Sequence, residues 1–369
     1  MKEVFFIMYK FAGGGAEKAT IILANELVKK GYKVTFLVKE NDGELVYLVD
    51  KKIKNIIVPA NPIRMIQRFA QIFKQNKSVC VFSISLGLTT YAVLGNVIAK
   101  NCIKLIPVVH YTINKDPAKF DNIKILIHKL FYKYIYTTIG VSEGCIKEYA
   151  KTMGISLKDC KVIYNPVVSE SLFALANSDN EHKWFKDKKA KVVVAAGRLC
   201  KIKNYKLLID AIKIAVDNGN NIKLIILGQG ELELSLKEYV KTLNLEDSID
   251  FYGFSNNPYS FFSKADCYVL SSDSEALPTV LIEALACGCP VVSTDCVSGP
   301  REILSDGEYG KLVPCNNPQM MAEAIVKTIN VTANNKEKLI NRSKVFGVEQ
   351  SVDQYLKLIE AAGGEIECN

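Results

Sequence analysis

The sequence is poor in residues that hold metal ions. It has only three histidines in 369 residues, and it has no clear Asp-x-Asp motif. Its 11 cysteines are scattered, and the one close pair, Cys287 and Cys289, lacks the spacing of a zinc or thioredoxin motif. We therefore expect free buried thiols in a reducing compartment and no protein-bound metal or other resident cofactor.

The chain also lacks the long apolar segments of membrane and secreted proteins. No apolar run approaches the roughly 20 residues that cross a bilayer, and the first residues lead directly into a strand pattern without the features of a signal peptide. Hydrophobic residues make up 49% and charged residues 23%, as in globular proteins. We expect a cytoplasmic protein of two domains.

Short apolar runs alternate with helical periodicity from end to end, which is the rhythm of βαβ units in a parallel sheet. In the first half, the predicted strands span residues 4–8, 34–38, 56–58, 79–83, 105–109 and 138–141, and the predicted helices span 17–30, 63–76 and 91–100. In the second half, strands are predicted at 191–196, 223–227, 249–252, 267–270 and from 291.

The pattern lapses into a polar, irregular stretch at 169–189 and then restarts. This predicts two doubly wound domains, 1–172 and 173–350. A last helical pattern at 351–362 follows the second sheet, so we expect 351–369 to cross back onto the first domain. Ligands of such sheets bind beyond the carboxyl ends of the strands, and two facing sheets would form a cleft that closes over substrate.

Two carboxylates eight residues apart, Glu275 and Glu283, flank the start of a predicted helix. Pro278 suits the first helical turn, and Gly288 suits a left-handed helix end. Glu283 lies among apolar residues, where a carboxylate needs partners such as a ribose diol. The helix N-terminus suits a phosphate. Alternatively, Glu275 could complement the helix dipole and Glu283 could point to solvent.

A glycine-rich turn, 13–15, follows the first strand and opens the first helix, so its N–H groups could approach a phosphate. A dinucleotide-binding fingerprint would need a third glycine at position 18. Lys18 stands there instead, which disfavours an oxidoreductase. An ordinary strand-to-helix turn is the structural alternative.

Two cations follow the predicted strand 191–196. Arg198 could bind a diphosphate through two parallel hydrogen bonds, and Lys203 could bind it as a point charge. Their positive charge would make the diphosphate a better leaving group without a metal ion. Alternatively, both residues could be ordinary surface charges. His110 ends the strand 105–109 and could contact a sugar or polarise a group, although a lone histidine there is often structural.

Charge is unevenly shared along the chain. Residues 1–170 contain 25 Lys and Arg against 13 Asp and Glu, a net of +12, and the remainder carries −4. This predicts an anionic partner for the first half, a membrane surface in preference to nucleic acid, since no nucleic-acid recognition motif accompanies the charge. The basic amphipathic helix predicted at 63–74 is a candidate for this membrane contact, and the basic, aromatic stretch 119–134 is a second candidate. Alternatively, both could be ordinary helices whose apolar sides pack on the core and whose lysines are solvated. The predicted acceptor or membrane contacts are Arg64, Arg68, Phe69 and Lys74.

Together these motifs resemble the retaining glycosyltransferases of family 4, which have the GT-B fold of two facing Rossmann-like domains. The most specific element is Glu275 with Glu283, the family's E-x7-E pattern, followed by ALACGCPVV. The supporting elements are the glycine turn, His110, GVSE at 140–143, YNP at 164–166, and Arg198 with Lys203. The run EALPTVLIE at 275–283, with SGPRE at 298–302, resembles bacterial enzymes that build capsule, O-antigen or protein-linked glycans, a less specific match than that to the family.

The resemblance implies a role for each of these residues. Glu283 would bind the ribose, Glu275 the donor sugar, and His110 would belong to the catalytic set with Arg198 and Lys203. The backbone of Leu277, Thr279 and the Gly14-Gly15 turn would lie near the diphosphate, and the nucleobase near Gly253 and Phe254. Pro278 departs from the glycine of many relatives, so its N–H is lost and neighbouring amides must compensate.

The implied reaction moves a hexose or N-acetylhexosamine, of the galactose, N-acetylgalactosamine or N-acetylglucosamine type, from a UDP-sugar. The acceptor is a polyprenyl-diphosphate-linked glycan at the cytoplasmic face of the membrane, with which the enzyme associates peripherally. A GT-B nucleotide-sugar epimerase and a non-catalytic nucleotide-sugar-binding protein are the alternatives. Conversion of the donor without an acceptor would identify an epimerase. Absence of any turnover would identify a non-catalytic binding protein.

Overall fold

A computed structural model describes residues 3–77, 79–110, 119–187, 189–331 and 335–364. The chain forms two compact units, an N-terminal unit of residues 1–166 and 348–369 and a C-terminal unit of residues 167–347. The first division falls after Pro166, whereas the sequence placed it after residue 172. The reason is that the N–H groups of Val167 and Val168 both donate to the carbonyl oxygen of Phe346, at 3.0 and 3.1 Å, so the segment after Pro166 already pairs within the C-terminal unit.

The N-terminal unit is built on a seven-stranded parallel sheet with the strand order β3-β2-β1-β4-β5-β6-β7. Its strands are rich in buried apolar residues on both faces, as expected of a sheet covered on both sides. The strands are β1 (Glu3–Met8), β2 (Lys33–Val38), β3 (Lys54–Ile57), β4 (Cys80–Ser83), β5 (Lys104–Val109), β6 (Thr138–Gly140) and β7 (Cys160–Val162).

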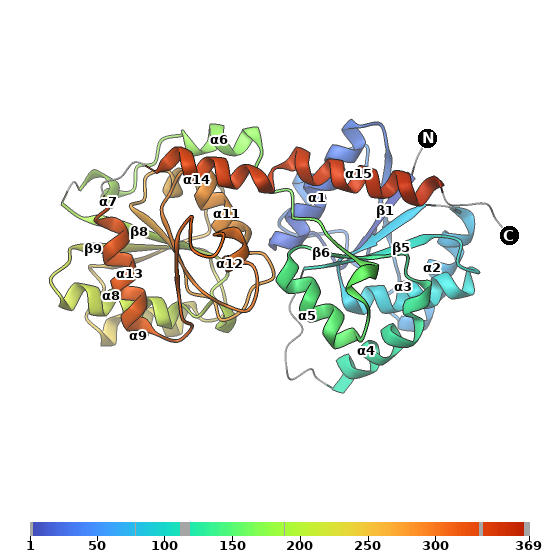
Figure 1. Ribbon diagram of the computed structural model, residues 1–369, viewed down its shortest axis with the longest axis horizontal. Helices are drawn as coiled ribbons and strands as arrows, with labels where there is room; N and C mark the ends of the chain where they lie inside the picture. Colours follow the sequence, from blue (N-terminus) through green and yellow to red (C-terminus); the bar gives the residue numbers. More distant parts are fainter. Residues whose placement is uncertain (1–2, 78, 111–118, 188, 332–334, 365–369) are drawn as a thin grey trace. The chain divides into compact units, whose positions relative to one another are not determined.

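Helices cover this sheet on both faces (Figure 1). α1 packs against α15, and α3 packs against both α2 and α4. The helices are α1 (Gly15–Lys29), α2 (Pro62–Gln75), α3 (Leu86–Ile98), α4 (Lys119–Phe131), α5 (Glu143–Met153) and α15 (Val348–Gly364), with the 3-10 turns η1 (Val46–Leu48), η2 (Tyr132–Tyr134) and η3 (Leu157–Asp159).

The C-terminal helix α15 belongs to the N-terminal unit, as the sequence predicted. It packs against α1 and β4, and the ring of Tyr355 meets the ring of Phe82 edge-on at 5.4 Å. Ser351 Oγ donates to the carbonyl oxygen of Tyr164 at 2.6 Å. Residues 365–369 of the predicted crossing segment lie outside the described residues.

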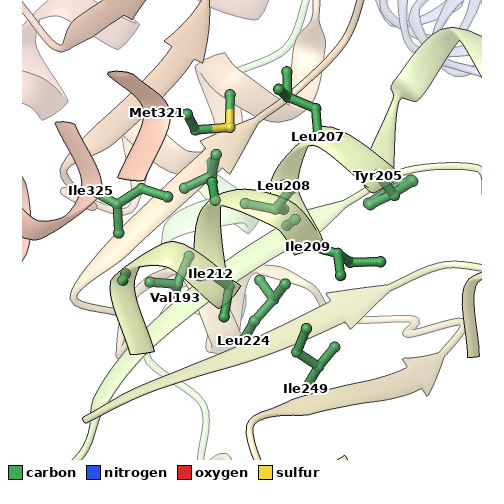
Figure 2. Packing of buried hydrophobic residues seen from close by; sticks show 14 of the residues in the cluster. Val193, Tyr205, Leu207, Leu208, Ile209, Ile212, Leu224, Ile249, Met321 and Ile325 are labelled. Carbon is green, nitrogen blue, oxygen red and sulfur yellow. The ribbon is translucent and has the colours of Figure 1, made fainter. Parts of the chain in front are cut away.

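The C-terminal unit is built on a six-stranded parallel sheet with the order β10-β9-β8-β11-β12-β13. Its core joins Val193 and Leu224 of the sheet to Leu208 of α8 and Met321 of α13 (Figure 2). The strands are β8 (Lys191–Ala196), β9 (Ile222–Leu227), β10 (Ile249–Gly253), β11 (Cys267–Leu270), β12 (Val291–Thr294) and β13 (Lys311–Val313).

The helices of the C-terminal unit form two groups, since α8 packs against α9 and α13, while α11 packs against α10 and α14. They are α6 (Glu170–Ala176), α7 (Lys183–Lys186), α8 (Tyr205–Asp217), α9 (Glu233–Thr242), α10 (Tyr259–Phe262), α11 (Thr279–Ala286), α12 (Pro300–Ile303), α13 (Pro318–Ile329) and α14 (Lys336–Ser343), with the 3-10 turns η4 (Lys201–Lys203) and η5 (Lys344–Phe346). Within the described ranges, no helix combines the length and apolar character needed to span a bilayer.

The predicted α/β class and doubly wound parallel sheets are confirmed. The irregular stretch predicted at 169–189 is wrong in part, because α6 and α7 lie within it. These helices have seven and four residues, too short for a periodic pattern to show. Strand order reverses between β1 and β4 and between β8 and β11, and ligands of such sheets bind at these reversals.

Candidate functional site

Three loops converge at one edge of the C-terminal unit's sheet. β8, β11 and β12 are consecutive parallel neighbours, so their carboxyl ends lie at the same edge. The loop after β8 carries Arg198 and Lys203, the loop after β11 carries Glu275, and the loop after β12 carries Ser298. The polar residues singled out in the second half of the sequence thus lie where a ligand of this fold would bind.

Lys203 and Glu275 form a partly buried ion pair. Lys203 Nζ lies 2.6 Å from Glu275 Oε1, with the two side chains 21% and 12% exposed. Ser272 Oγ donates to the same carboxylate oxygen at 2.6 Å. No described residue bonds to the other oxygen, Oε2. One oxygen of Glu275 is therefore fixed by the protein, and the other can accept a hydrogen bond from a ligand.

Backbone contacts join the loop after β11 to the loop after β8. Ser271 Oγ donates to the carbonyl oxygen of Lys203 at 2.8 Å, and the Asp273 N–H donates to that of Ile202 at 2.9 Å. The Asn204 side-chain amide donates to Asp273 Oδ1 at 2.7 Å. Motif matching missed these residues, although the serine-rich run SSDSE was a visible signal of a hydrogen-bonded loop.

Hydroxyls at the end of β12 and in the loop that follows it fix the position of Glu275 itself. Thr294 Oγ1 donates to the carbonyl oxygen of Ser272 at 2.5 Å. Ser298 Oγ donates to the backbone carbonyl oxygen of Glu275. Thr294 and Ser272 are fully buried, and Ser298 is nearly so. The carboxylate is thus held through its backbone and through its side chain.

Two buried tyrosines hold the end of β8. The Tyr205 hydroxyl donates to the carbonyl oxygen of Gly197 at 3.1 Å, and the Tyr268 hydroxyl donates to that of Ala196 at 3.4 Å. Burial raises the pKa of both tyrosines well above the usual value, with the nearby Glu275 carboxylate adding to the shift. Both hydroxyls therefore stay protonated and can keep donating. This fixes the backbone from which Arg198 projects.

Arg198 is an accessible cation beside the Lys203–Glu275 pair. Its side chain is 72% exposed, and its Nε lies 3.5 Å from Glu231 Oε2. An exposed pair at that distance is weak. The structure thus gives the two predicted diphosphate ligands different settings, since Lys203 is paired with Glu275 while Arg198 can turn toward an incoming anion.

Glu283 is buried within the chain, not directed to solvent. It is 4% exposed and lies on α11 between Ile282 and Ala284, which are fully buried. The Tyr259 hydroxyl donates to its Oε1 at 3.3 Å. The solvent-facing alternative is therefore wrong, and the expectation that this carboxylate needs partners is met in part by a tyrosine that the sequence patterns did not reveal.

α11 begins at Thr279, one residue later than predicted. Pro278 occupies the N-cap position with φ −69° and ψ 96°, an extended conformation outside the helix. Leu277 is nearly buried. The predicted left-handed end is confirmed, since Gly288 has φ +70°. Only the residues from Thr279 onward offer N–H groups at the helix start.

Gly253 and Phe254, the predicted nucleobase neighbours, lie at the end of β10. Gly253 has φ +87°, and its carbonyl oxygen accepts a hydrogen bond from the Gly228 N–H at 2.7 Å. Phe254 is 64% exposed. An exposed aromatic ring at a strand end offers a stacking face to a base.

In the N-terminal unit, carboxylates of the chain itself occupy the glycine turn. The Gly13 N–H donates to Glu44 Oε2 at 3.0 Å, and a Cβ on Gly14 would lie 2.3 Å from Glu17 Oε2. Burial raises the pKa of Glu17, and the neighbouring Glu44 raises it further. Gly14 is the N-cap of α1 and Gly15 its first residue. A phosphate approaching this turn would have to displace these carboxyl groups.

His110 ends β5, as predicted. Burial lowers the pKa of its imidazole to about 4, so the ring is neutral near pH 7. Neither ring nitrogen has a hydrogen-bond partner among the described residues. It lines a small pocket with Thr20, Asn165 and Tyr355. A neutral imidazole can donate or accept a hydrogen bond, but it supplies no charge.

The predicted membrane contact of Phe69 is wrong. Phe69 is fully buried on the inner face of α2, where it stacks on Phe73 with ring centroids 5.7 Å apart. The apolar stripe of this helix packs into the core, which was the structural alternative. Arg64 and Lys74 are exposed, and Arg68 donates to the Gln71 side chain at 2.8 Å.

Two sequence-family profiles together cover most of the chain. The profile described as Glycosyl transferases group 1 matches residues 177–346. The profile described as Glycosyltransferase Family 4 matches residues 13–171.

Curated relatives and a solved structure extend the match. The amylovoran biosynthesis glycosyltransferase AmsD of Erwinia amylovora is 31% identical over 299 residues, 80% of this chain and 81% of that one. The N-acetylgalactosamine-N,N'-diacetylbacillosaminyl-diphospho-undecaprenol 4-alpha-N-acetylgalactosaminyltransferase of Campylobacter jejuni is 33% identical over 234 residues, which is 61% of each chain. The Anabaena protein HepE, crystallised with UDP, superposes with a TM-score of 0.81 at 19% identity, over 98% of this chain and 100% of that one.

Replacing Gly299 by alanine should lower the melting temperature. Gly299 has φ +87°, and a Cβ there would lie 2.5 Å from Pro278 Cδ and 3.1 Å from the carbonyl oxygen of Ala276. We expect a loss of about 1–3 kcal/mol in the free energy of unfolding, measured by chemical denaturation. The control is Gly363→Ala, where the added Cβ meets nothing within 4 Å. Equal stability of Gly299→Ala and wild type would show that the loop after β12 is not constrained by Pro278.

Proposed function

The chain belongs to glycosyltransferase family 4 and has the GT-B fold, and on this basis we propose the donor, the acceptor and the course of its reaction. It transfers a hexose or N-acetylhexosamine from a UDP-sugar to a polyprenyl-diphosphate-linked glycan, with retention at the anomeric carbon and without a metal ion. The observation that carries the proposal is the Lys203–Glu275 pair with Ser272, beside the accessible Arg198, at one sheet edge.

The names of the relatives support the acceptor. The Campylobacter jejuni relative is named for transfer to a diphospho-undecaprenol-linked sugar, and AmsD for synthesis of amylovoran. The UDP crystallised with HepE agrees with a UDP-sugar donor. An acceptor with a polyprenyl chain lies in a membrane, so the enzyme works peripherally at the cytoplasmic face.

In this proposal the diphosphate is held by charge. Arg198 swings from its weak contact with Glu231 to grip the phosphate oxygens through its planar fork. Lys203 Nζ shares its protons between Glu275 Oε1 and the diphosphate. These two cations stabilise the negative charge that grows on the leaving diphosphate as the bond between the anomeric carbon and the phosphate oxygen breaks.

In this proposal the carboxylates of Glu275 and Glu283 position the donor and do not act as general acid or general base. Glu275 Oε2 accepts a hydrogen bond from a sugar hydroxyl, because Oε1 is already held by Lys203 and Ser272. Glu283, oriented by Tyr259, accepts hydrogen bonds from the ribose. The base stacks near Phe254 beyond Gly253, and the amides of Leu277 and Thr279 lie near the phosphates.

The bond to the diphosphate breaks and the bond to the acceptor forms on the same face of the sugar. The acceptor hydroxyl attacks the anomeric carbon on the side from which the diphosphate leaves, and a departing phosphate oxygen takes the hydroxyl proton. No strong protein base is required. The protein's contribution is positioning and electrostatic stabilisation.

Arg198→Ala should reduce transfer severely while leaving the fold intact. The side chain is 72% exposed, so its removal costs little stability, and loss of one contact that stabilises charge in the transition state typically lowers kcat by about 100-fold or more. Transfer of labelled sugar from UDP-sugars to polyprenyl-diphosphate glycans is measured by mass spectrometry, with Lys206→Ala, an exposed cation on α8, as the control. Near wild-type transfer by Arg198→Ala would refute the assignment. Donor conversion without acceptor would instead identify an epimerase.

Ser272→Ala should lower kcat about tenfold with little change in the melting temperature, since one hydrogen bond that orients Glu275 is lost. The KM for the donor should change less than kcat, because Lys203 still holds the carboxylate near its position. Steady-state kinetics measure both constants. The control is Ser235→Ala on α9, whose hydroxyl donates to the carbonyl oxygen of Leu232, the residue before that helix. An unchanged kcat would mean that Ser272 does not orient the carboxylate.

A further inference from the structure

The β12–α12 loop, residues 295–299, carries Ser298, whose Oγ donates to the backbone carbonyl oxygen of Glu275. The position of this loop therefore affects the position of that carboxylate. The loop has little to hold it from within, because α12 has only four residues and a helix that short is not stable alone. Val297, within the loop, is 76% exposed. Contacts with other segments of the C-terminal unit must fix its conformation.

An ion pair joins the two ends of the β12–α12 loop. Asp295 is the first residue of the loop, and Arg301 is the second residue of α12. Arg301 Nε donates to Asp295 Oδ1 at 3.1 Å, and its Nη2 donates to Asp295 Oδ2, so the guanidinium bonds both carboxylate oxygens. A bidentate pair of this kind fixes direction as well as distance. It ties the end of β12 to α12 across the loop that carries Ser298.

Both members of this pair have further anchors. The Asp295 N–H donates to the carbonyl oxygen of Val313 in β13 at 2.7 Å. Arg301 Nη1 donates to Asp306 Oδ1 at 3.1 Å. The side chains of Arg301 and Asp295 are 56% and 27% exposed. An isolated exposed pair contributes little, but a bidentate pair with a further charged partner can hold one geometry.

The far end of α12 is held by Arg342 of α14. Its Nε and Nη2 donate to the carbonyl oxygens of Ile303 and Glu302, at 2.9 and 2.6 Å. Such contacts satisfy carbonyl groups that a helix C-terminus leaves without intrahelical partners. α12 also packs against α11, the helix that begins at Thr279. The Asp295–Arg301 pair therefore connects the loop to a helix that is itself held in place.

Direct binding of a substrate anion is the alternative role for Arg301, since more than half of its side chain is exposed. However, Nε, Nη1 and Nη2 each already donate to a carboxylate oxygen of Asp295 or Asp306. Two carboxylates offset the charge of this guanidinium. Arg198, by contrast, lies 3.5 Å from Glu231 in a weak exposed pair. The contacts of Arg301 therefore favour a role in holding the loop.

We propose that Arg301 is a positioning residue for the transfer reaction. Through Asp295 it fixes the β12–α12 loop, and through Ser298 the loop fixes Glu275, whose Oε2 accepts the hydrogen bond from the donor sugar. The inference rests on the proposed function, because it acts on the step in which Glu275 takes part. It also gives a role to the run SGPRE, in which the serine contacts the site and the arginine holds the serine's loop.

The test measures sugar transfer by the full-length variants Arg301→Ala, Asp295→Ala, their double variant and Arg301→Lys. Each single alanine variant should lower kcat about tenfold, and the double variant should be no worse than either, because all three lose the same pair. Arg301→Lys should retain more activity than Arg301→Ala, because it keeps the charge but not the bidentate geometry. Melting temperatures near that of wild type show that the variants are folded. Multiplying losses in the double variant would overturn the inference.

Binding of UDP, measured by calorimetry, separates positioning from direct contact. UDP lacks the sugar that Glu275 holds, so Arg301→Ala should bind UDP as tightly as wild type does. A loss of UDP affinity would overturn the inference, because the guanidinium would then contact the diphosphate itself. The matched control is Lys213→Ala, which breaks a pair with Asp217 within α8. An equal fall of kcat in this control would also overturn the inference.

Hydrogen–deuterium exchange, measured by mass spectrometry, tests the proposed coupling without turnover. Peptides that contain residues 271–279 should exchange faster in Arg301→Ala than in wild type, because Ser298 holds their backbone less firmly. Unchanged exchange in this segment would overturn the inference. If the wild type transfers no sugar while exchange rises in the variant, the coupling is supported and the proposed function is refuted.

Discussion

The candidate site depends on the ion pair between Lys203 and Glu275. Bringing two charges out of water is costly unless each finds partners, and here the pair is only 21% and 12% exposed. Its partners are supplied by neighbouring loops, with Ser272 on the carboxylate and Ser271 on the lysine backbone. The pair therefore joins the loops that follow β8 and β11, and the positions of the other groups of the candidate site follow from that junction.

The sequence predicted the architecture because parallel strands buried on both faces read as apolar runs separated by helical periods. It also placed Glu275 in a loop, Glu283 on a helix and Gly288 at a left-handed helix end, since glycine, proline and apolar spacing are local signals. The start of α11 was predicted one residue early. Pro278 fits either the first turn or the position before it, and in the structure it takes the position before it, in an extended conformation close to Gly299.

Contacts between distant segments were beyond the sequence. Tyr259 reaches Glu283 from 24 positions away, and Lys203 reaches Glu275 from 72. The buried position of Phe69 depends on a second helix, α3, which composition cannot reveal. Likewise the glycine turn suggested an open phosphate cradle, whereas Glu44, 31 residues on, occupies one of its amides. Local patterns identify candidate groups, and tertiary packing decides which of them are accessible.

The candidate site is framed by hydroxyl groups, namely those of Ser272, Ser298, Tyr205, Tyr259 and Tyr268. Burial keeps the pKa of Tyr205 and Tyr268 far above the physiological range, and serine hydroxyls do not titrate there. The hydroxyls of Ser272, Ser298, Tyr205 and Tyr268 therefore keep their protons from mildly acid to alkaline solution. A pH profile of turnover would accordingly not report on deprotonation of these four groups.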